Sequence, residues 1–261
     1  MKLKLGLILF FVVVIAVSAQ TNFMNSFDDI KIAYTDQGKG IPVLLIHGFI
    51  NSKNSWDKTI LKKDLLENGY RVIALDLRGN GESGKPQNDV AYHNNAEVKD
   101  IILLLDKLKI NRCLAVGYSR GSIVLAKLLT VESRIKKAVM GGMGIDFTNP
   151  DWDRRILFAD AFNNKITNET KGAVNYAKSI GADLKSLHLQ QKHQPVTSIS
   201  ELQSINAKVL VLAGNKDLDN GNPEDLQRTI PNAVLKIVEG DHNGTYKTGA
   251  FSNEVVKFLQ D

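Results

Sequence analysis

The residues best suited to chemistry lie in residues 117–121, which read Gly-Tyr-Ser-Arg-Gly, a G-x-S-x-G pattern. An apolar, strand-like run at residues 113–116 leads directly into this pattern, and a helical pattern follows it. A serine on such a sharp turn has a strained backbone. Small residues two places before and after it are needed where neighbouring backbone leaves no room for a Cβ atom. The pattern predicts Ser119 as a nucleophile.

A serine hydroxyl needs a base to accept its proton, and histidine has a pKa close to neutrality. The chain has five histidines. His242 follows the last expected strand, so its loop should share the carboxyl edge of the sheet with Ser119. His47 ends an earlier strand and is expected to brace the next loop. His93, His188 and His193 lie in a polar loop or in a helical stretch. His242 is therefore the predicted base.

The base needs a carboxylate that orients the imidazole and stabilises its charged form. Asp217 follows the expected strand at residues 208–212 and is the predicted partner. Asp219 and Asp241 are close by in sequence and remain alternatives. The chain order Ser119, Asp217, His242 is the order of one particular serine hydrolase arrangement.

An oxyanion in acyl transfer needs two preorganised N–H donors. The backbone N–H of Arg120, the residue after the nucleophile, is predicted as one of them. The other is expected from Phe49, in the loop after the strand at residues 43–46, where Gly48 allows a tight turn.

Alternating elements must position these residues. Apolar runs predict strands at residues 31–35, 43–46, 72–75, 113–116, 137–140, 208–212 and 234–238. Helical patterns occupy residues 53–68, 94–108, 122–129 and 253–259. The alternation predicts an α/β fold with a mostly parallel central sheet flanked by helices.

Between about residues 144 and 200 the alternation stops. Three amphipathic stretches, residues 149–162, 169–180 and 183–191, predict a helical cap insertion over the sheet. Its aromatic residues could line an apolar pocket for an acyl or aromatic group: Trp152, Phe158, Phe162 and Tyr176. Residues 20–261 are thus expected to form one domain that includes this cap.

The N-terminal residues 1–19 resemble a secretory signal. Lys2 and Lys4 precede an apolar run at residues 5–17, which is short for a membrane span, and small residues favour cleavage after Ala19. The protein is expected to be secreted or periplasmic, with no stable membrane span after cleavage. An uncleaved anchor is the alternative.

Composition narrows the function further. The net charge of +5 is spread along the chain without a block of Lys and Arg, which argues against nucleic-acid binding. The single cysteine, Cys113, excludes an internal disulfide and is expected to be a buried apolar residue. No Cys/His spacing typical of a metal site is present, so neither a metal nor a cofactor is expected. The oligomeric state stays open.

The chain resembles the α/β-hydrolase superfamily at residues 47–49, 76–83, 117–121, 214–217 and 240–242, in the family's order and spacing. The resemblance implies the α/β-hydrolase fold and the triad Ser119, Asp217 and His242. It also implies that residues 76–83 are a structural loop and that residues 144–195 occupy the place of the family's cap. Tyr118 and Arg120 depart from the small or apolar residues common beside the nucleophile. The Arg120 side chain is expected to pair on the surface, with an acidic substrate group as the alternative partner.

These residues predict hydrolysis of a small-molecule ester-type substrate through an acyl-enzyme on Ser119. Thioesterases, lactonases, aminopeptidases and cofactor-free haloperoxidases use the same triad and stay open as alternatives. So do an acyltransferase and a non-catalytic binding protein. Haloalkane dehalogenases and epoxide hydrolases need an aspartate nucleophile, so Ser119 argues against both.

Overall fold

The computed structural model describes residues 20–217 and 219–261. The predicted signal peptide, residues 1–19, and its cleavage point lie outside the described residues. Among the residues that are described, no helix has the length and apolar character to cross a membrane. Export and cleavage therefore stay predictions.

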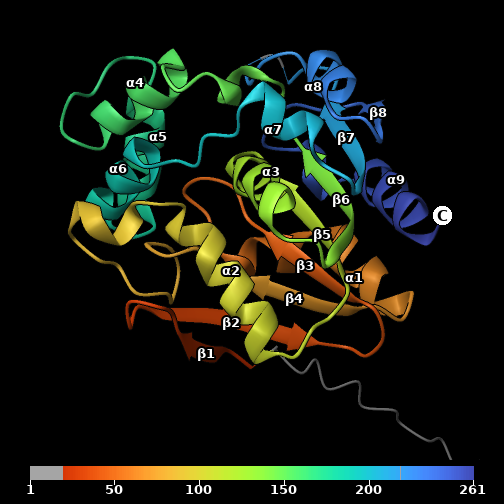
Figure 1. Cartoon of the computed structure of the whole chain (residues 1–261). Coiled ribbons are helices and arrows are strands. Elements are labelled where there is room, and N and C mark those ends of the chain that lie inside the picture. Colours follow the sequence, from red (N-terminus) through yellow and green to blue (C-terminus); the bar gives the residue numbers. More distant parts are fainter. Residues whose placement is uncertain (1–19, 218) are drawn as a thin grey trace, which may run out of the picture.

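An eight-stranded sheet forms the centre of the molecule, in the order β1-β2-β4-β3-β5-β6-β7-β8 (Figure 1). The pairs from β4 to β8 are parallel, whereas β2 pairs antiparallel with both β1 and β4. The strands are β1 (Asn22–Asn25), β2 (Lys31–Gln37), β3 (Pro42–Ile46), β4 (Arg71–Leu75), β5 (Cys113–Tyr118), β6 (Ile135–Gly141), β7 (Lys208–Gly214) and β8 (Ala233–Val238). The mostly parallel sheet predicted from the sequence is confirmed.

Helices cover both faces of this sheet. One face packs against α2 (Ala96–Lys107), α3 (Arg120–Val131), α7 (Ile199–Gln203) and α8 (Pro223–Thr229). The other packs against α1 (Ile60–Glu67) and α9 (Gly249–Gln260). Parallel strands buried on both faces are continuously apolar, which is why the sequence pattern identified them. We call the sheet and these helices the body.

Two local predictions were wrong. The helix expected at residues 53–68 is interrupted at Thr59, which is extended, with a short 3-10 helix, η1 (Lys53–Lys58), before it and α1 after it. The Thr59 side chain accepts a hydrogen bond from the Lys62 amide and so caps α1. The edge strand β1 was missed, because Met24 is its only buried side chain and one buried residue makes no repeating pattern.

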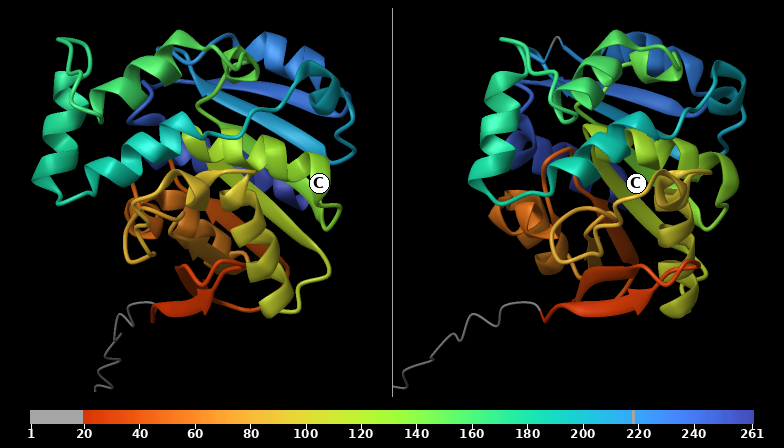
Figure 2. Two further views of the ribbon diagram at one scale, coloured as in Figure 1. Left: turned by 60° about the vertical axis from the view of Figure 1, so that its left-hand side comes forward. Right: turned by 90° about the vertical axis from the view of Figure 1, so that its left-hand side faces the viewer.

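The remaining helices α4 (Asp153–Ala161), α5 (Lys171–Ser179) and α6 (Leu184–Lys192) lie within the stretch expected to be helical. Figure 1 and Figure 2 show them grouped on one side of the molecule, outside the helical layers of the sheet. We call residues 152–194, which include these three helices and the chain between them, the cap. Short 3-10 helices complete the fold: η2 (Asp89–Tyr92), η3 (Asp146–Thr148) and η4 (Thr245–Lys247).

Candidate active site

Ser119 occupies a strained turn between β5 and α3. Its backbone angles, φ 53° and ψ −124°, lie in a region that non-glycine residues rarely adopt. A Cβ atom on Gly117 would lie 2.5 Å from the Gly121 carbonyl oxygen, and one on Gly121 would lie 2.2 Å from the Ile46 carbonyl oxygen. Both glycines are therefore required by close backbone approach, as the G-x-S-x-G pattern predicts.

The structure brings the three predicted triad residues together. His242 Nε2 lies 2.8 Å from Ser119 Oγ, and His242 Nδ1 lies 2.8 Å from Asp217 Oδ2. His242 follows β8 and Asp217 follows β7, so parallel strands bring both loops to the carboxyl edge where Ser119 lies. Asp217 is buried, whereas Ser119 and His242 are partly exposed. This is the geometry of a nucleophile, a base and an orienting carboxylate.

The two alternative carboxylates occupy other positions. Asp219 and Asp241 are both exposed. The Asp241 carboxylate accepts a hydrogen bond from the Gly244 amide at 2.6 Å. In the described part of the chain, Asp217 is the only carboxylate that hydrogen-bonds His242. The structure thus favours Asp217 over both alternatives.

Asn220 belongs to the same cluster and was not foreseen. It is buried, and its Nδ2 lies 3.1 Å from Asp217 Oδ1 and 3.0 Å from His242 Nδ1. Because Nδ1 of a base paired with Asp217 carries a proton, the Asn220 amide donates to Asp217, so both carboxylate oxygens accept a hydrogen bond. An asparagine in a loop has no sequence pattern that distinguishes this role from an ordinary turn.

Tyr118 connects the nucleophile turn to the loop of the base. Its hydroxyl donates a hydrogen bond to the His242 carbonyl oxygen at 2.7 Å. Its ring packs against Tyr246 and Phe251, with centroid distances of 4.7 and 5.7 Å. Burial raises the pKa of the Tyr118 phenol, so the hydroxyl stays protonated and remains a donor. Tyr118, which departs from the residue types common at this position of the family, thus joins the nucleophile turn to the loop that carries the base.

The two amides expected to hold an oxyanion lie beside Ser119. Arg120 is the first residue of α3, so its N–H has no acceptor within the helix. Phe49 follows Gly48, at which a Cβ atom would lie 3.3 Å from the Ser119 Cβ. Within residues 20–217 and 219–261, neither amide donates to a protein acceptor. Both are therefore free to bind a substrate oxygen.

The expected surface position of the Arg120 side chain is wrong. Arg120 is buried, and its guanidinium donates to both carboxylate oxygens of Glu97 at 2.8 and 2.7 Å. It also donates to the Gln190 carbonyl oxygen of α6 at 2.9 Å. The side chain does pair with an acid, but in the interior, where it joins α3 to α2 and to the cap.

His47 has the structural role that the sequence suggested. Its Nε2 accepts a hydrogen bond from the Leu77 amide at 3.1 Å, so Nδ1 carries the proton and donates to the Gly48 carbonyl oxygen at 2.8 Å. Burial lowers the pKa of His47 and keeps the ring neutral. The ring therefore fixes the loop that carries Gly48 and Phe49.

Ser119 lies between two cavities that share Phe49, Ser119 and His242. The larger, of about 530 Å³, is also lined by Tyr118, Tyr176 and Tyr246. The smaller, of about 260 Å³, is also lined by Trp152 and Phe158 of the cap.

A third cleft, of about 710 Å³, lies around α4 and includes none of the triad residues. Three of the four cap aromatics named above thus face the site. The fourth, Phe162, packs edge-on against Phe49 at 5.3 Å.

The sequence and the fold of this chain are both similar to those of known proteins. The family model described as "alpha/beta hydrolase fold" matches residues 41–190, more than half of the chain. A curated non-heme haloperoxidase of Rhodococcus erythropolis is 31% identical in a match that covers 91% of this chain and 99% of that protein. Matches to several other curated relatives are shorter and cover between 40% and 56% of the relatives' own length.

Solved structures agree on the fold. A bromoperoxidase from Bacillus anthracis superposes with a TM-score of 0.77 at 23% identity, and the match covers 93% of this chain and 100% of that one. An esterase from Exiguobacterium antarcticum superposes with a TM-score of 0.78 at 22% identity and the same coverage. At these identities the likeness shows a common fold.

Proposed function

Because the chain belongs to the alpha/beta hydrolase fold family, we propose that it is a serine hydrolase of small-molecule esters or related acyl compounds. The observation that carries the proposal is the unbroken hydrogen-bond chain from Ser119 through His242 to Asp217, with 2.8 Å at each contact. A chain of this kind activates a hydroxyl that is otherwise a poor nucleophile.

In the proposed reaction, Ser119 Oγ attacks the substrate carbonyl carbon while its proton passes to His242 Nε2. The tetrahedral oxyanion accepts hydrogen bonds from the Phe49 and Arg120 amides. Collapse breaks the bond to the leaving alcohol, which takes the proton from His242. Water then attacks the acyl-enzyme, again with His242 as the base, and releases the acid. Asp217 holds the imidazole tautomer throughout. These steps require no metal or cofactor.

The decisive experiment compares the wild type with Ser119→Ala, which removes the nucleophile and little else. Hydrolysis of p-nitrophenyl acetate and butyrate measures turnover, and a fluorophosphonate probe labels an activated serine covalently. We expect turnover and labelling in the wild type, and loss of both in the variant. Labelling without turnover would point to another acyl donor. A folded protein with neither would contradict the proposal and favour a non-catalytic binder.

A haloperoxidase reaction is the second candidate, because the Rhodococcus relative of nearly full coverage carries that name. It is distinguished by halogenation of an activated organic acceptor in the presence of bromide and hydrogen peroxide. Transfer to an alcohol instead of water is distinguished by ester products when methanol is added. Thioesters, lactones and aminoacyl amides, assayed side by side, would separate the other reactions of the same triad.

We further propose that the protein is exported and cleaved after Ala19. The basic, apolar and small-residue succession in residues 1–19 supports this proposal. The intact mass of the protein recovered from a secreting host tests it. A chain that begins at Gln20 is expected, and a full-length membrane-bound chain would contradict cleavage.

A further inference from the structure

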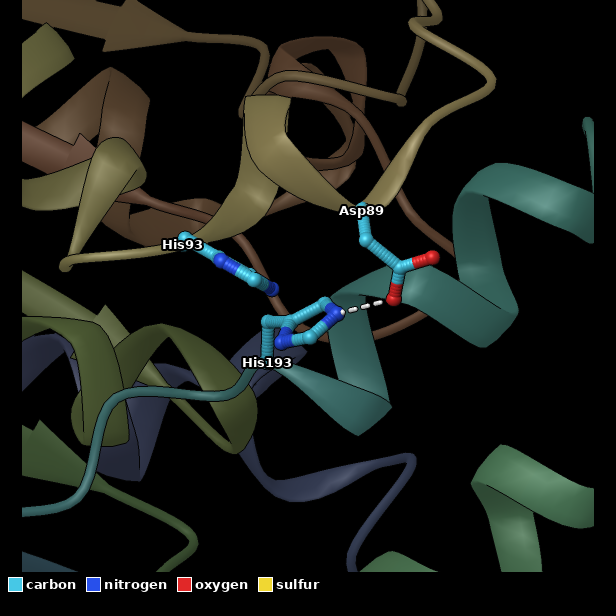
Figure 3. A group of neighbouring side chains, drawn as sticks. All are labelled: Asp89, His93 and His193. Carbon is cyan, nitrogen blue, oxygen red and sulfur yellow. Dashed lines mark hydrogen bonds and ion pairs between the residues drawn. The ribbon is translucent and has the colours of Figure 1, made fainter.

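Away from the triad, the structure gathers two histidines and a carboxylate at the junction of body and cap. Asp89 begins η2, His93 directly follows it, and His193 directly follows α6. One ligand atom from each residue lies within 4.8 Å of the others. Figure 3 shows the three side chains converging, with His193 Nε2 at 2.7 Å from Asp89 Oδ1. The rings of His93 and His193 have centroids 4.2 Å apart.

An ordinary ion pair explains only part of this arrangement. Asp89 pairs with His193 and with Lys192. His93, however, makes no side-chain hydrogen bond within the described residues, although it lies against a second imidazole. Two imidazoles side by side repel each other when protonated and are commonly found together as metal ligands.

We propose that Asp89, His93 and His193 bind a divalent transition-metal ion of the Zn²⁺ class, which fastens the end of α6 to η2. Imidazole nitrogen and carboxylate oxygen are the donors that Zn²⁺ takes in proteins, and three protein ligands leave a fourth position for water. This site lies apart from Ser119, and its role is to hold the cap.

The ligands need to move to coordinate the ion. Two ligand atoms around a tetrahedral Zn²⁺ lie about 3.3 Å apart. The contact between His193 and Asp89 must therefore open from its present 2.7 Å, and ligand atoms that lie up to 4.8 Å apart must approach, so binding requires rotation of the side chains. The Lys192 side chain, whose ammonium competes for the same Asp89 oxygen, is 48% exposed and can move into water.

Such an ion would act on a helix that already touches the active-site region. The Gln190 carbonyl oxygen of α6 accepts a hydrogen bond from Arg120, and the Gln190 side chain donates to the Arg78 carbonyl oxygen. Gln191 and Gln194, on either side of His193, line the smaller cavity beside Ser119. A metal at the end of α6 would therefore stiffen one wall of that cavity.

The test uses untagged protein, treated with a chelator and then freed of it, and titrated with ZnCl₂ in a calorimeter. We expect one equivalent to bind with micromolar affinity. At a hundredfold excess over Kd, the melting temperature should rise by about 5 °C. Co²⁺ in place of Zn²⁺ should give the visible absorption bands of a tetrahedral nitrogen and oxygen site.

Three variants test the position of the site. His93→Ala removes an exposed side chain without hydrogen bonds, so it should fold normally, yet weaken Zn²⁺ binding at least about 100-fold. His193→Ala should do the same. Lys192→Ala removes the competing ammonium and should tighten binding. In all three variants His47, His188 and His242 are unchanged, so a site elsewhere in the chain would survive.

The proposal is overturned if 1 mM Zn²⁺ neither binds nor raises the melting temperature of the wild type. It is equally overturned if binding persists unchanged in His93→Ala and His193→Ala. Neither result bears on the triad, because ester hydrolysis and fluorophosphonate labelling report on Ser119 independently.

Discussion

The body and the cap differ in the contacts that stabilise them. In the body, continuous apolar clusters fill the space on both sides of the sheet. In the cap, a small cluster that includes Phe162, Val174 and Leu187 packs onto Ile50. A second small cluster joins Leu189 of the cap to Ala91 and Tyr92 of the body, and polar contacts such as that from Arg120 to Gln190 add to the attachment. The triad lies on loops of the body, while the cavity walls include residues of the cap. Variants of the triad in the body should therefore change kcat, and variants of cap residues that line the cavities beside Ser119 should change KM.

The largest expected effect concerns the orienting carboxylate of the body. Asp217→Asn keeps the shape of the side chain but favours the wrong imidazole tautomer, so we expect kcat for ester hydrolysis to fall by about 10,000-fold. The melting temperature should change little. Asp219→Asn is the matched control: Asp219 lines the smaller cavity but is exposed and does not hydrogen-bond His242, so kcat should stay close to wild type. Equal losses in the two variants would contradict the assignment of Asp217.

The junction of body and cap should respond through stability. Arg120→Met leaves the Glu97 carboxylate buried without its partner, which should lower the free energy of unfolding by about 3 to 5 kcal/mol. Urea denaturation measures this loss. The double variant Arg120→Met with Glu97→Leu removes both charges and should recover most of it. A single variant as stable as the wild type would mean that the buried pair does not hold the junction.

A pair of glycine substitutions compares backbone tolerance in the two regions. Gly121→Ala in the body places a methyl group 2.2 Å from the Ile46 carbonyl oxygen and should cost about 3 kcal/mol of unfolding free energy. Gly172→Ala in α5 of the cap meets no atom within 4 Å and should stabilise the protein by about 0.4 to 1 kcal/mol. Thermal and urea unfolding measure both. If the two variants have the same free energy of unfolding, the expected difference in backbone tolerance between body and cap is wrong.

The comparison of body and cap also explains which parts of the fold and of the site could be predicted from the sequence. The buried strands and the nucleophile turn carry local patterns, namely apolar runs and a glycine on each side of Ser119, so both could be predicted. Asp217 and His242 could be predicted because each lies in the loop after a recognisable strand, and parallel strands end at one edge.

Features that depend on contacts between distant segments could not be predicted in this way. Arg120 is buried because Glu97 and Gln190, on two other helices, meet it there. His93 and His193 lie in separate segments, so no short spacing identifies them as neighbours. The break at Thr59 has a related cause: the Lys53 amide and ammonium both bind the buried Asp76 after β4, which fixes η1 independently of α1.

A substitution at Trp152 tests whether the cap contributes to substrate binding. Trp152 precedes α4 and lines the smaller cavity, at some distance in sequence from every triad residue. Trp152→Ala removes apolar surface that binds substrate and transition state alike, so we expect KM for p-nitrophenyl butyrate to rise about tenfold while kcat stays nearly constant. Ile156 is an exposed residue of α4 that lines another cleft, so Ile156→Ala should change neither constant. If Trp152→Ala instead lowered kcat with KM unchanged, the cap would take part in forming the transition state, and the division of roles between body and cap would be wrong.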